Sequence, residues 1–481
     1  MTALTVARHR TAIKRTDLSR PIRIARDDGL ITSDVSVFDY GCGHGDDIQR
    51  LLKLGINCQG WDPVYRPSAE RIRCDVVNLG YVVNVIENPE ERAASLRDAW
   101  SLTERVLIVS ARLSHESAER QVAFEDGCLT RRQTFQKYYE QRELGDWIDQ
   151  VVGVSSVAAA PGVFYVFRDS EARQSFTAAR YRRPILPPRL RYSEVAFEQH
   201  RALLEPLIDF ITARGRLPNE SELKVAQGIH DELGGLGRAF ALIRRVTGTE
   251  QWDQIRQERS QDLLVYFALA RFDRRPRFSE LSPELQLDVR AFFSSYAKAC
   301  TLADSLLFSA GDRKLIDEAC RTSRIGKVTP EALYVHNTAL PHLAPILLVY
   351  EGCARALIGT VEGANIIKLH REKPQVSYLR YPGFEKDAHP ALAASLKVDL
   401  QTCRLKYTEY AKSANPPILH RKELFLPIDH RLRSKFSKLT QQEEAWGLYE
   451  SPQLIGTREG WASALEARGA RISGHRLKRL V

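Results

Sequence analysis

One segment, residues 35–62, restricts the possible folds of this chain more than any other part of its 481 residues. It begins with a short apolar run at residues 35–38, which is typical of a buried parallel strand. A glycine-rich turn follows, then an apolar helical pattern that ends at Gly55, then a second apolar run at 56–61. The order strand, glycine turn, helix, strand and acid predicts a Rossmann-like α/β unit with a nucleotide site at the glycine turn.

The glycine turn carries the groups that could contact a cofactor. An acid and three glycines occupy alternate positions in it: Asp39, Gly41, Gly43 and Gly45. This spacing differs from the Gly-x-Gly-x-x-Gly of dinucleotide sites, although glycine lets the backbone approach a ligand closely in both. Asp46 or Asp47 is expected to cap the following helix, whose first amides would face that ligand. An ordinary strand-to-helix turn in an α/β protein is the alternative interpretation.

The spacing of this turn resembles the first motif of class I methyltransferases, which use S-adenosylmethionine. The resemblance implies that Asp39 steadies the glycine loop or binds the methionine amino group, and that Asp62 binds the ribose hydroxyls. The implied cofactor contacts are Asp39, Gly41, Cys42, Gly43, Gly45, Asp62 and Asn78. The cofactor has no pyrophosphate, so a tight loop around its amino-acid part takes the place of a phosphate-binding turn.

Residues 75–89 resemble the fourth strand and the following loop of the same methyltransferase fold. The connection from Asp62 to this strand is too short for the helix and third strand that many members insert. Asn78-Leu-Gly-Tyr81 keeps the outer residues of the Asn-Pro-Pro-Tyr motif of DNA and protein amino-methyltransferases but lacks both prolines. In that motif the asparagine accepts a hydrogen bond from the target amine, and the aromatic ring stacks on the flipped base. The resemblance implies catalytic roles for Asn78 and Tyr81, and cofactor contact or loop packing is the alternative.

Helical and strand patterns divide the rest of the chain. A helix beginning at Pro89, strands at 105–110 and 162–167, and a helix around Trp147 complete the methyltransferase-like unit. Later strands are expected at 366–370, 376–379 and 399–407. We therefore predict a Rossmann-like α/β domain, a mostly helical middle region and an α+β C-terminal region. The predicted parts are a basic helical segment at 1–34, the methyltransferase domain at 35–170, a Pro/Arg linker at 171–192, the helical domain at 193–330, and the α+β domain with a basic tail at 331–481.

The balance of charges favours a polyanionic partner. The net charge is +10 and the pI about 9.2, and basic residues cluster in the N-terminal segment, in the linker and at 471–479. The N-terminal segment would cover the cofactor or contact a phosphate backbone, and a solvated pair of helices is the alternative. The linker arginines are Arg180, Arg182, Arg183, Arg189 and Arg191. DNA is the predicted partner, and an ordinary solvated basic surface is the alternative.

Cysteines, histidines and apolar runs narrow the class of protein further. The eight cysteines form no Cys-x-x-Cys pair, so neither a zinc knuckle nor a disulfide framework is predicted. The late histidines, such as His389 and His420, lack metal-ligand spacing, and no metal site is predicted. No apolar run is long enough to cross a bilayer, and no signal peptide is recognisable. These features predict a cytoplasmic protein with no membrane partner.

Over nearly its whole length, the chain resembles the DNA phosphorothioation-associated methyltransferase family. The shared motifs are Leu18-Ser-Arg-Pro21, Phe38-Asp-Tyr-Gly-Cys-Gly-His-Gly45, Gly60-Trp-Asp-Pro63, Asn78-Leu-Gly-Tyr-Val-Val-Asn84, His336-Asn-Thr-Ala-Leu-Pro341, Tyr350-Glu-Gly-Cys-Ala354 and Asn415-Pro-Pro-Ile-Leu-His-Arg-Lys-Glu423. The resemblance implies a bacterial protein encoded near modification and restriction systems that replace a DNA phosphate oxygen with sulfur. It also implies methyl transfer to DNA, with other phosphorothioation proteins as partners. The alternatives are RNA or a small molecule as the methyl acceptor, or a DNA-binding subunit that binds the cofactor without catalysis.

Overall fold

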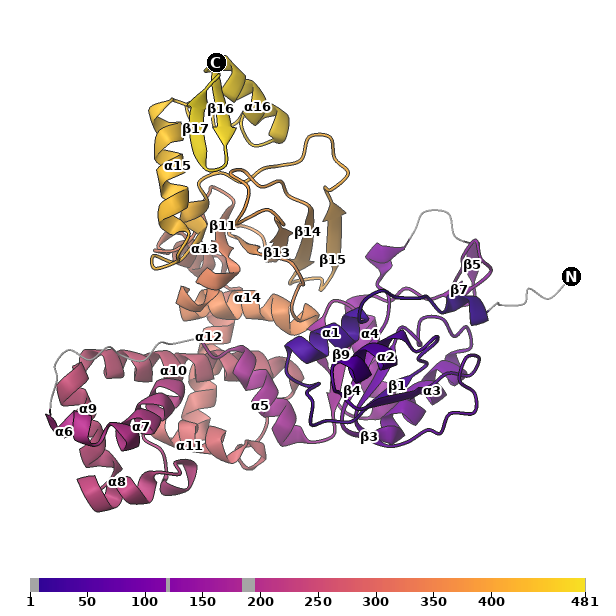
Figure 1. Ribbon diagram of the computed structural model, residues 1–481, viewed down its shortest axis with the longest axis horizontal. Coiled ribbons are helices and arrows are strands. Elements are labelled where there is room, and N and C mark those ends of the chain that lie inside the picture. The colour runs from indigo at the N-terminus through magenta and orange to yellow at the C-terminus, as the bar shows by residue number, and fades with distance from the viewer. Residues whose placement is uncertain (1–7, 118–121, 184–194, 481) are drawn as a thin grey trace, which may run out of the picture. The chain divides into compact units, whose positions relative to one another are not determined.

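Two compact units make up the computed structural model, which describes residues 8–117, 122–183 and 195–480 (Figure 1). The first unit combines residues 1–169, 320–342 and 351–481, and the second combines 170–319 and 343–350. The first contains both large sheets, whereas the second is helical. In the part of the chain that the structure describes, no helix is long and apolar enough to cross a membrane.

The first sheet of unit 1 has the strand order β2-β1-β3-β4-β9-β8. Its strands are β1 (Val37–Tyr40), β2 (Cys58–Trp61), β3 (Cys74–Gly80), β4 (Thr103–Ser110), β8 (Val157–Ala160) and β9 (Val163–Phe167). The first four strands in that order are parallel, whereas β9 runs antiparallel to its neighbours β4 and β8. The strand order reverses between β1 and β3, and α/β sheets bind ligands at the carboxyl ends of the strands at such a switch point. This topology confirms the predicted Rossmann-like fold.

The strand β2 is an edge of this sheet. Between β2 and β3, residues 62–73 contain an isolated bridge from Asp62 to Arg66 and turns, with no helix or strand. The prediction that this connection is too short for a third strand is therefore confirmed. Val64 and Tyr65, which follow the acid at the end of β2, are exposed.

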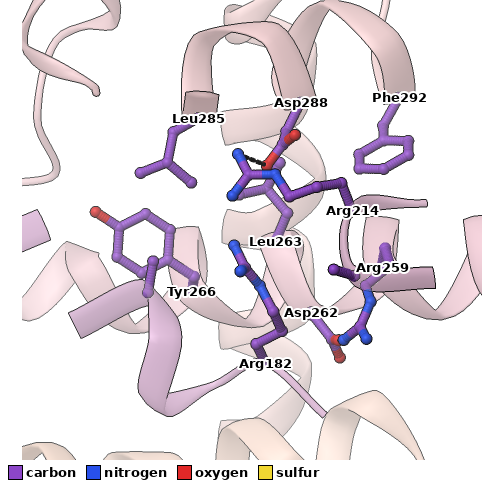
Figure 2. Close-up of a pocket in the computed structure, with 11 residues that line it drawn as sticks. Arg182, Arg214, Arg259, Asp262, Leu263, Tyr266, Leu285, Asp288 and Phe292 are labelled. Carbon is purple, nitrogen blue, oxygen red and sulfur yellow. Dashed lines mark hydrogen bonds and ion pairs between the residues drawn. The ribbon is translucent and has the colours of Figure 1, made fainter. Parts of the chain in front are cut away.

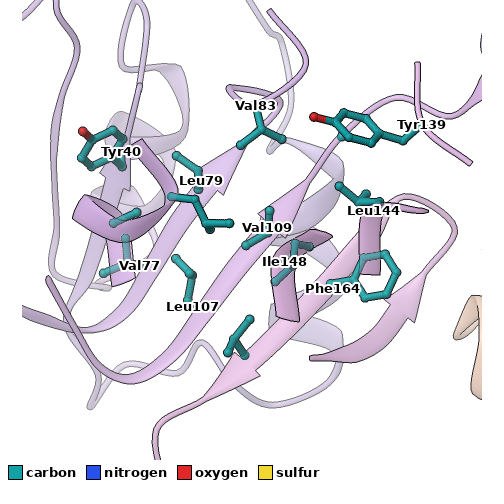
Figure 3. Packing of buried hydrophobic residues seen from close by; sticks show 14 of the residues in the cluster. Tyr40, Val77, Leu79, Val83, Leu107, Val109, Tyr139, Leu144, Ile148 and Phe164 are labelled. Carbon is teal, nitrogen blue, oxygen red and sulfur yellow. The ribbon is translucent and has the colours of Figure 1, made fainter. Parts of the chain in front are cut away.

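Apolar side chains of the central strands pack against helices α3 (Pro89–Leu102) and α4 (Gln141–Val152) (Figure 3). Leu107 of β4 and Leu144 and Ile148 of α4 are fully shielded from water. Each such side chain stabilises the fold by roughly 1.5–3 kcal/mol when it leaves water. This core therefore holds rigid the strands whose ends carry the glycine loop.

The two helices that follow β1 and β3 begin differently. The helix α3 begins at Pro89, as predicted, and the preceding asparagine side chain accepts hydrogen bonds from two amides of its first turn. The helix α2 (Asp46–Lys53) is preceded by Gly45 in a left-handed conformation, and no side chain caps it. The prediction that Asp46 or Asp47 caps this helix is wrong, because both lie inside its first turn and bind amides of a distant segment.

Unit 2 is helical, as predicted for this part of the chain. Its helices are α5 (Ser170–Arg180), α6 (Val195–Gln199), α7 (Arg201–Arg214), α8 (Ala226–Leu233), α9 (Leu236–Thr247), α10 (Glu250–Leu269), α11 (Pro283–Phe292), α12 (Tyr296–Gly311) and most of α13 (Arg313–Arg321). The segment predicted as a linker at 171–192 begins as a helix, since its prolines start only at Pro184 and alanines favour helix before that. Residues 184–194 lie outside the described residues.

The second large sheet of unit 1 is an antiparallel meander. Its strands, in spatial order, are β10 (Lys327–Val328), β11 (Ala332–His336), β12 (Ile366–His370), β13 (Gln375–Arg380), β14 (Ala394–Asp399) and β15 (Leu405–Glu409). The predicted strands at 366–370 and 376–379 are confirmed by β12 and β13. The helix α14 (Pro345–Ile358) precedes β12, and α15 (Arg433–Ala445) and α16 (Arg458–Ala467) follow the sheet.

Three features of unit 1 differ from the sequence predictions. The single strand expected at 399–407 contains the turn between β14 and β15, because the Asp399 carboxylate accepts hydrogen bonds from two following amides. The expected basic tail is an antiparallel hairpin of β16 (Ala470–Ser473) and β17 (Arg476–Arg479). An unexpected small sheet follows β4 and is formed by β5 (Val122–Phe124), β6 (Gly127–Leu129) and β7 (Phe135–Gln136).

Candidate active site

Asp39 and Asn78 lie side by side on two neighbouring parallel strands. Asp39 of β1 is in register with Asn78 of β3, and Asn78 Nδ2 donates a 2.8 Å hydrogen bond to Asp39 Oδ1. Both residues are buried. Burial, and secondly the nearby Asp47 carboxylate, raises the pKa of Asp39 to about 7. Asn78 Oδ1 is buried and has no hydrogen-bond partner among the described residues, so it can accept one from a ligand.

The loop after β1 follows a path that glycine adopts readily and other residues do not. Gly41 and Gly43 have φ angles of 78° and 52°, in the left-handed region. A Cβ atom at Gly41 would lie 2.5 Å from the Val82 side chain. The Gly41 and Cys42 amides donate hydrogen bonds to the Trp61 carbonyl, which holds the loop at the end of β2. The loop therefore presents bare backbone beside Asp39 and Asn78.

Asp62, directly after β2, uses its carboxylate to shape the same loop. Its Oδ2 accepts a 3.0 Å hydrogen bond from the Gly43 amide, and its Oδ1 accepts 2.9 Å bonds from the Val64 and Tyr65 amides. A carboxylate offers about four acceptor positions, so about one is left for a ligand hydroxyl. The sequence suggested the ribose role of Asp62 but not this second role in holding Gly43.

The N-terminal segment lies against the start of α2. Asp46 Oδ2 accepts a 2.6 Å hydrogen bond from the Arg15 amide, and Asp47 Oδ1 accepts a 2.7 Å bond from the Ser19 amide. Ala12 lies next to the glycine loop, with its Cβ 3.2 Å from where a Cβ of Gly43 would be. The N-terminal segment therefore lies against the glycine loop, and its role in covering the cofactor stays a prediction. The two acids directly after the glycines were the only sequence signal for this contact with the N-terminal segment. Helix capping was the simpler explanation of these acids.

These groups line a cavity that is open to solvent. Four residues of the predicted site line it: Asp39, Gly41, Cys42 and Asn78. The sequence prediction missed further lining residues: Arg15, Ser19, Asp46 and Asp47. Gly43, Gly45 and Asp62 are not in the lining and shape the surrounding loop instead. The cavity thus has several acidic residues and one arginine in its lining and suits a ligand that carries both a cationic and an anionic group.

Tyr81 and Asn78, the two predicted catalytic residues, have different surroundings. Asn78 is buried and turned towards Asp39, whereas Tyr81 is half-buried and not part of the cavity lining. Tyr81 has a φ of 60°, a conformation that is costly for a residue other than glycine. Its amide donates a hydrogen bond to the Ser110 carbonyl, and the Arg15 guanidinium lies 6.0 Å from its ring centre. The backbone therefore holds Tyr81 beside the N-terminal segment.

Among the described residues, no group of three or more His, Cys, Asp or Glu side chains is arranged to bind a metal. His389 and His420 do meet, with ring centres 4.7 Å apart. His389 Nε2 lies 2.9 Å from a Glu443 carboxylate oxygen, and His420 Nε2 donates a 2.7 Å hydrogen bond to the Ile455 carbonyl. Each imidazole thus has a protein partner, which assigns the pair to the packing of unit 1.

Comparisons with solved structures find likeness over about a third of the chain. No family model and no curated protein matches. Among solved structures, magnesium protoporphyrin IX methyltransferase from Synechocystis PCC 6803 with bound SAM has 16% identity and a TM-score of 0.22, over 31% of this chain and 76% of that one. CalS10, an amino pentose methyltransferase from Micromonospora echinaspora, has 15% identity and a TM-score of 0.24, over 31% and 89%. The CcbJ methyltransferase from Streptomyces caelestis has 15% identity and a TM-score of 0.23, over 31% and 95%. Likeness at identities and TM-scores this low transfers neither cofactor nor substrate to this chain.

Proposed function

We propose that this chain is an S-adenosylmethionine-dependent methyltransferase that acts on DNA in association with a bacterial phosphorothioation system. The observation that carries the proposal is the cavity where Asp39, Asn78 and a left-handed glycine loop meet at the switch point of a Rossmann-like sheet. That position is where such sheets bind nucleotide-like ligands. The sequence of the loop resembles the first motif of class I methyltransferases.

The donors and acceptors of the cavity fit S-adenosylmethionine. The Asp39 and Asp47 carboxylates suit its ammonium group, and the Arg15 guanidinium suits its carboxylate. Asn78 Oδ1 is a buried acceptor in need of a donor, and the last acceptor position of Asp62 suits a ribose hydroxyl. The cofactor, when bound, supplies an activated methyl group. The chain would contribute mainly orientation, because holding the acceptor in line with that methyl removes most of the entropic barrier.

A basic hairpin supports DNA as the acceptor. In the register of β16 and β17, Arg471 stands directly opposite Lys478, and like charges in that position repel. Neither side chain pairs with an acid among the residues that the structure describes, whereas nearby Arg468 pairs with Glu450. A phosphate backbone would relieve the repulsion. The predicted cytoplasmic location and phosphorothioation partners belong to the same proposal.

Two alternatives come from the same residues. The Asn78–Tyr81 stretch lacks the prolines of the DNA amino-methyltransferase motif, which favours RNA or a small molecule as the acceptor. The orientation of Asn78 towards Asp39 favours a cofactor-binding subunit without catalysis.

Calorimetry and a labelled-methyl assay separate these possibilities. We expect the full-length protein to bind S-adenosylmethionine and to transfer labelled methyl to duplex DNA. Transfer to RNA alone would replace the substrate, and binding without transfer to any acceptor would favour the non-catalytic subunit. No binding at all would refute the proposal. Methyl-group tracing on genomic DNA from cells with and without the gene then identifies the modified base.

A further inference from the structure

Unit 2 contains a cavity of about 340 Å³ that has no part in the proposed methyl transfer (Figure 2). It is bounded by the end of α5 and by α7, α10 and α11. Three guanidinium groups line it, from Arg182, Arg214 and Arg259, together with the Asp262 and Asp288 carboxylates. Leucine, alanine and aromatic side chains complete its wall. Arginines gathered around a cavity usually either neutralise acids or bind an anion, and the hydrogen bonds decide between these roles.

The two carboxylates of this cavity are already occupied. Asp288 Oδ1 accepts a 2.7 Å hydrogen bond from Arg216 Nε, and its Oδ2 lies 2.8 Å from Arg214 Nη2. Asp262 Oδ2 accepts a 3.2 Å bond from Arg259 Nη1, and its Oδ1 pairs with a second arginine. Only 6% of Asp262 and 5% of Asp288 is exposed. Little acceptor capacity is therefore left for further arginine donors.

Two of the lining arginines still have donors to spare. Arg182 forms no ion pair or side-chain hydrogen bond with any residue that the structure describes, and its guanidinium points towards that of Arg214 in Figure 2. Arg214 Nε is buried without an acceptor, and the Nη2 contact with Asp288 lacks the alignment of a hydrogen bond. Burial lowers the pKa of both guanidinium groups, and Asp288 opposes that effect. Arg182 is exposed, whereas Arg214 Nε is buried, and a buried donor without an acceptor is costly and indicates a missing partner.

We infer that this cavity is an oxyanion site that takes a phosphate group between Arg182 and Arg214. Guanidinium groups present paired N–H donors that match two oxygens of a phosphate. Arg259 is fixed beside them by 3.1 and 3.2 Å hydrogen bonds to the Thr212 carbonyl. The Arg214 side chain is largely buried, which strengthens its charged contacts. The site needs neither S-adenosylmethionine nor methyl transfer, so it goes beyond the proposed function.

The phosphate has two possible sources with the same chemistry. It is either a phosphodiester of a nucleic-acid backbone or a free phosphate, including that of a small phosphomonoester. Both require the Arg182 guanidinium, which has no hydrogen-bond or ion-pair partner among the described residues. They differ in whether that guanidinium contributes to the salt dependence of DNA binding, since each phosphate contact adds to the slope of log affinity against log salt.

Phosphate titration of the full-length protein tests the site without cofactor. We expect inorganic phosphate, at constant ionic strength, to bind the native protein, and Arg182→Gln to weaken that affinity by roughly ten- to hundredfold, the usual size of a lost charged hydrogen bond. Arg182→Lys should fall in between, because it keeps the charge but loses the paired donors. The matched control is Arg313→Gln, which removes an exposed arginine at the start of α13 and should bind phosphate as the native protein does.

The possible results either overturn the site or assign the source of its phosphate. Native protein that does not bind phosphate, or Arg182→Gln protein that binds it normally, overturns the site. Equal weakening in Arg313→Gln also overturns it, because the effect would then be one of general charge. If the site is upheld, a DNA salt slope that falls by about one in Arg182→Gln assigns the phosphate to nucleic acid, whereas an unchanged slope assigns it to a free anion. Circular dichroism and thermal unfolding confirm that each variant is folded, and failure of S-adenosylmethionine binding would leave these titrations unaffected.

Discussion

Asn78 Nδ2 donates a 2.8 Å hydrogen bond to Asp39 Oδ1 and so joins the ends of β3 and β1 beside the glycine loop. The bond orients the Asn78 amide and leaves its carbonyl oxygen without a partner among the described residues. Burial raises the pKa of the Asp39 carboxyl to about 7, and the hydrogen bond from Asn78 opposes that effect. The charge of the groups that could bind a cofactor therefore depends on pH.

Asp39→Asn should raise the melting temperature at pH 8 and change it little below about pH 4. The folded pKa of about 7 lies above the ordinary 3.8, so the stabilising effect of the protonated carboxyl is complete below about pH 4 and is lost as the pH rises through 7. Asparagine keeps an oxygen for the Asn78 amide without the charge. Thermal unfolding across this pH range measures the difference.

Asp75→Asn is the matched control for Asp39. Hydrogen bonds from the Ser36 amide and hydroxyl lower the pKa of Asp75. Its stabilising effect is thus present at neutral pH and is lost as the pH falls through its folded pKa. We expect this variant to be less stable than the native protein at pH 8. A stabilised Asp75→Asn protein, or an Asp39→Asn protein with no pH-dependent gain, would contradict the assignment.

Asp62→Ala should weaken S-adenosylmethionine binding by about ten- to hundredfold, since charged hydrogen bonds contribute roughly 1.5–3 kcal/mol. The variant loses the ribose acceptor and also the bond that holds the Gly43 amide. Calorimetry measures the change, and circular dichroism checks the fold. Asp62→Asn is the control for the loop after β2. Its amide oxygen can keep the bonds from the Val64 and Tyr65 amides, whereas its nitrogen cannot accept the bond from the Gly43 amide. Unchanged affinity in folded Asp62→Ala protein would refute the ribose role.

Tyr81→Gly should not destabilise the fold through its backbone, because glycine adopts the φ of 60° without the cost of roughly 1–2 kcal/mol that other residues bear. If the ring faces the acceptor, turnover should fall while cofactor affinity holds. Denaturant unfolding and the methyl-transfer assay measure the two effects separately. Asn78→Ala should show the reverse pattern, with a loss of affinity, because Asn78 lines the cavity and holds Asp39. Equal loss of turnover in both variants at saturating cofactor would indicate that both face the acceptor.

Replacing Arg471, Arg476 and Lys478 by Gln should flatten the salt dependence of DNA binding by about one unit of slope for each phosphate that the hairpin no longer neutralises. These residues belong to the hairpin strands, and all are exposed. Filter binding over a range of salt concentrations measures the slope. Arg313→Gln with Lys314→Gln is the control, because it removes exposed charge from α13 of unit 2. An unchanged slope in the hairpin variant would remove the hairpin from the proposed DNA surface.

Among the described linker arginines, Arg183 is held in an ion pair, and this changes how the linker can be tested. Arg183 pairs with Asp262, and both side chains are largely buried. Breaking such a pair costs roughly 3–5 kcal/mol when it is fully buried, so Arg183→Gln should lower the stability of unit 2. The loss of DNA binding in a variant that includes Arg183 would then have two explanations. Arg182→Gln avoids this problem, and Arg189 and Arg191 lie outside the described residues.

The sequence by itself determined the features that depend on neighbours along the chain. The alternating glycines after a short apolar strand, Pro89 at a helix start and the short connection after Asp62 each restrict the backbone within a few residues. They predicted the Rossmann-like sheet and the start of α3, and the structure contains both. They also predicted a connection too short for a third strand, and residues 62–73 contain no strand.

Only the tertiary structure decided which groups far apart in the sequence form hydrogen bonds and ion pairs. Asp46 looks like a helix cap in sequence, yet it binds the amide of Arg15, which is 31 positions away. Asp39 meets Asn78 across 39 positions, and Arg183 meets Asp262 across 79. The physical reason is that local conformation depends on sterics between adjacent residues, whereas burial, pKa and hydrogen-bond partners depend on which strands and helices come to lie side by side.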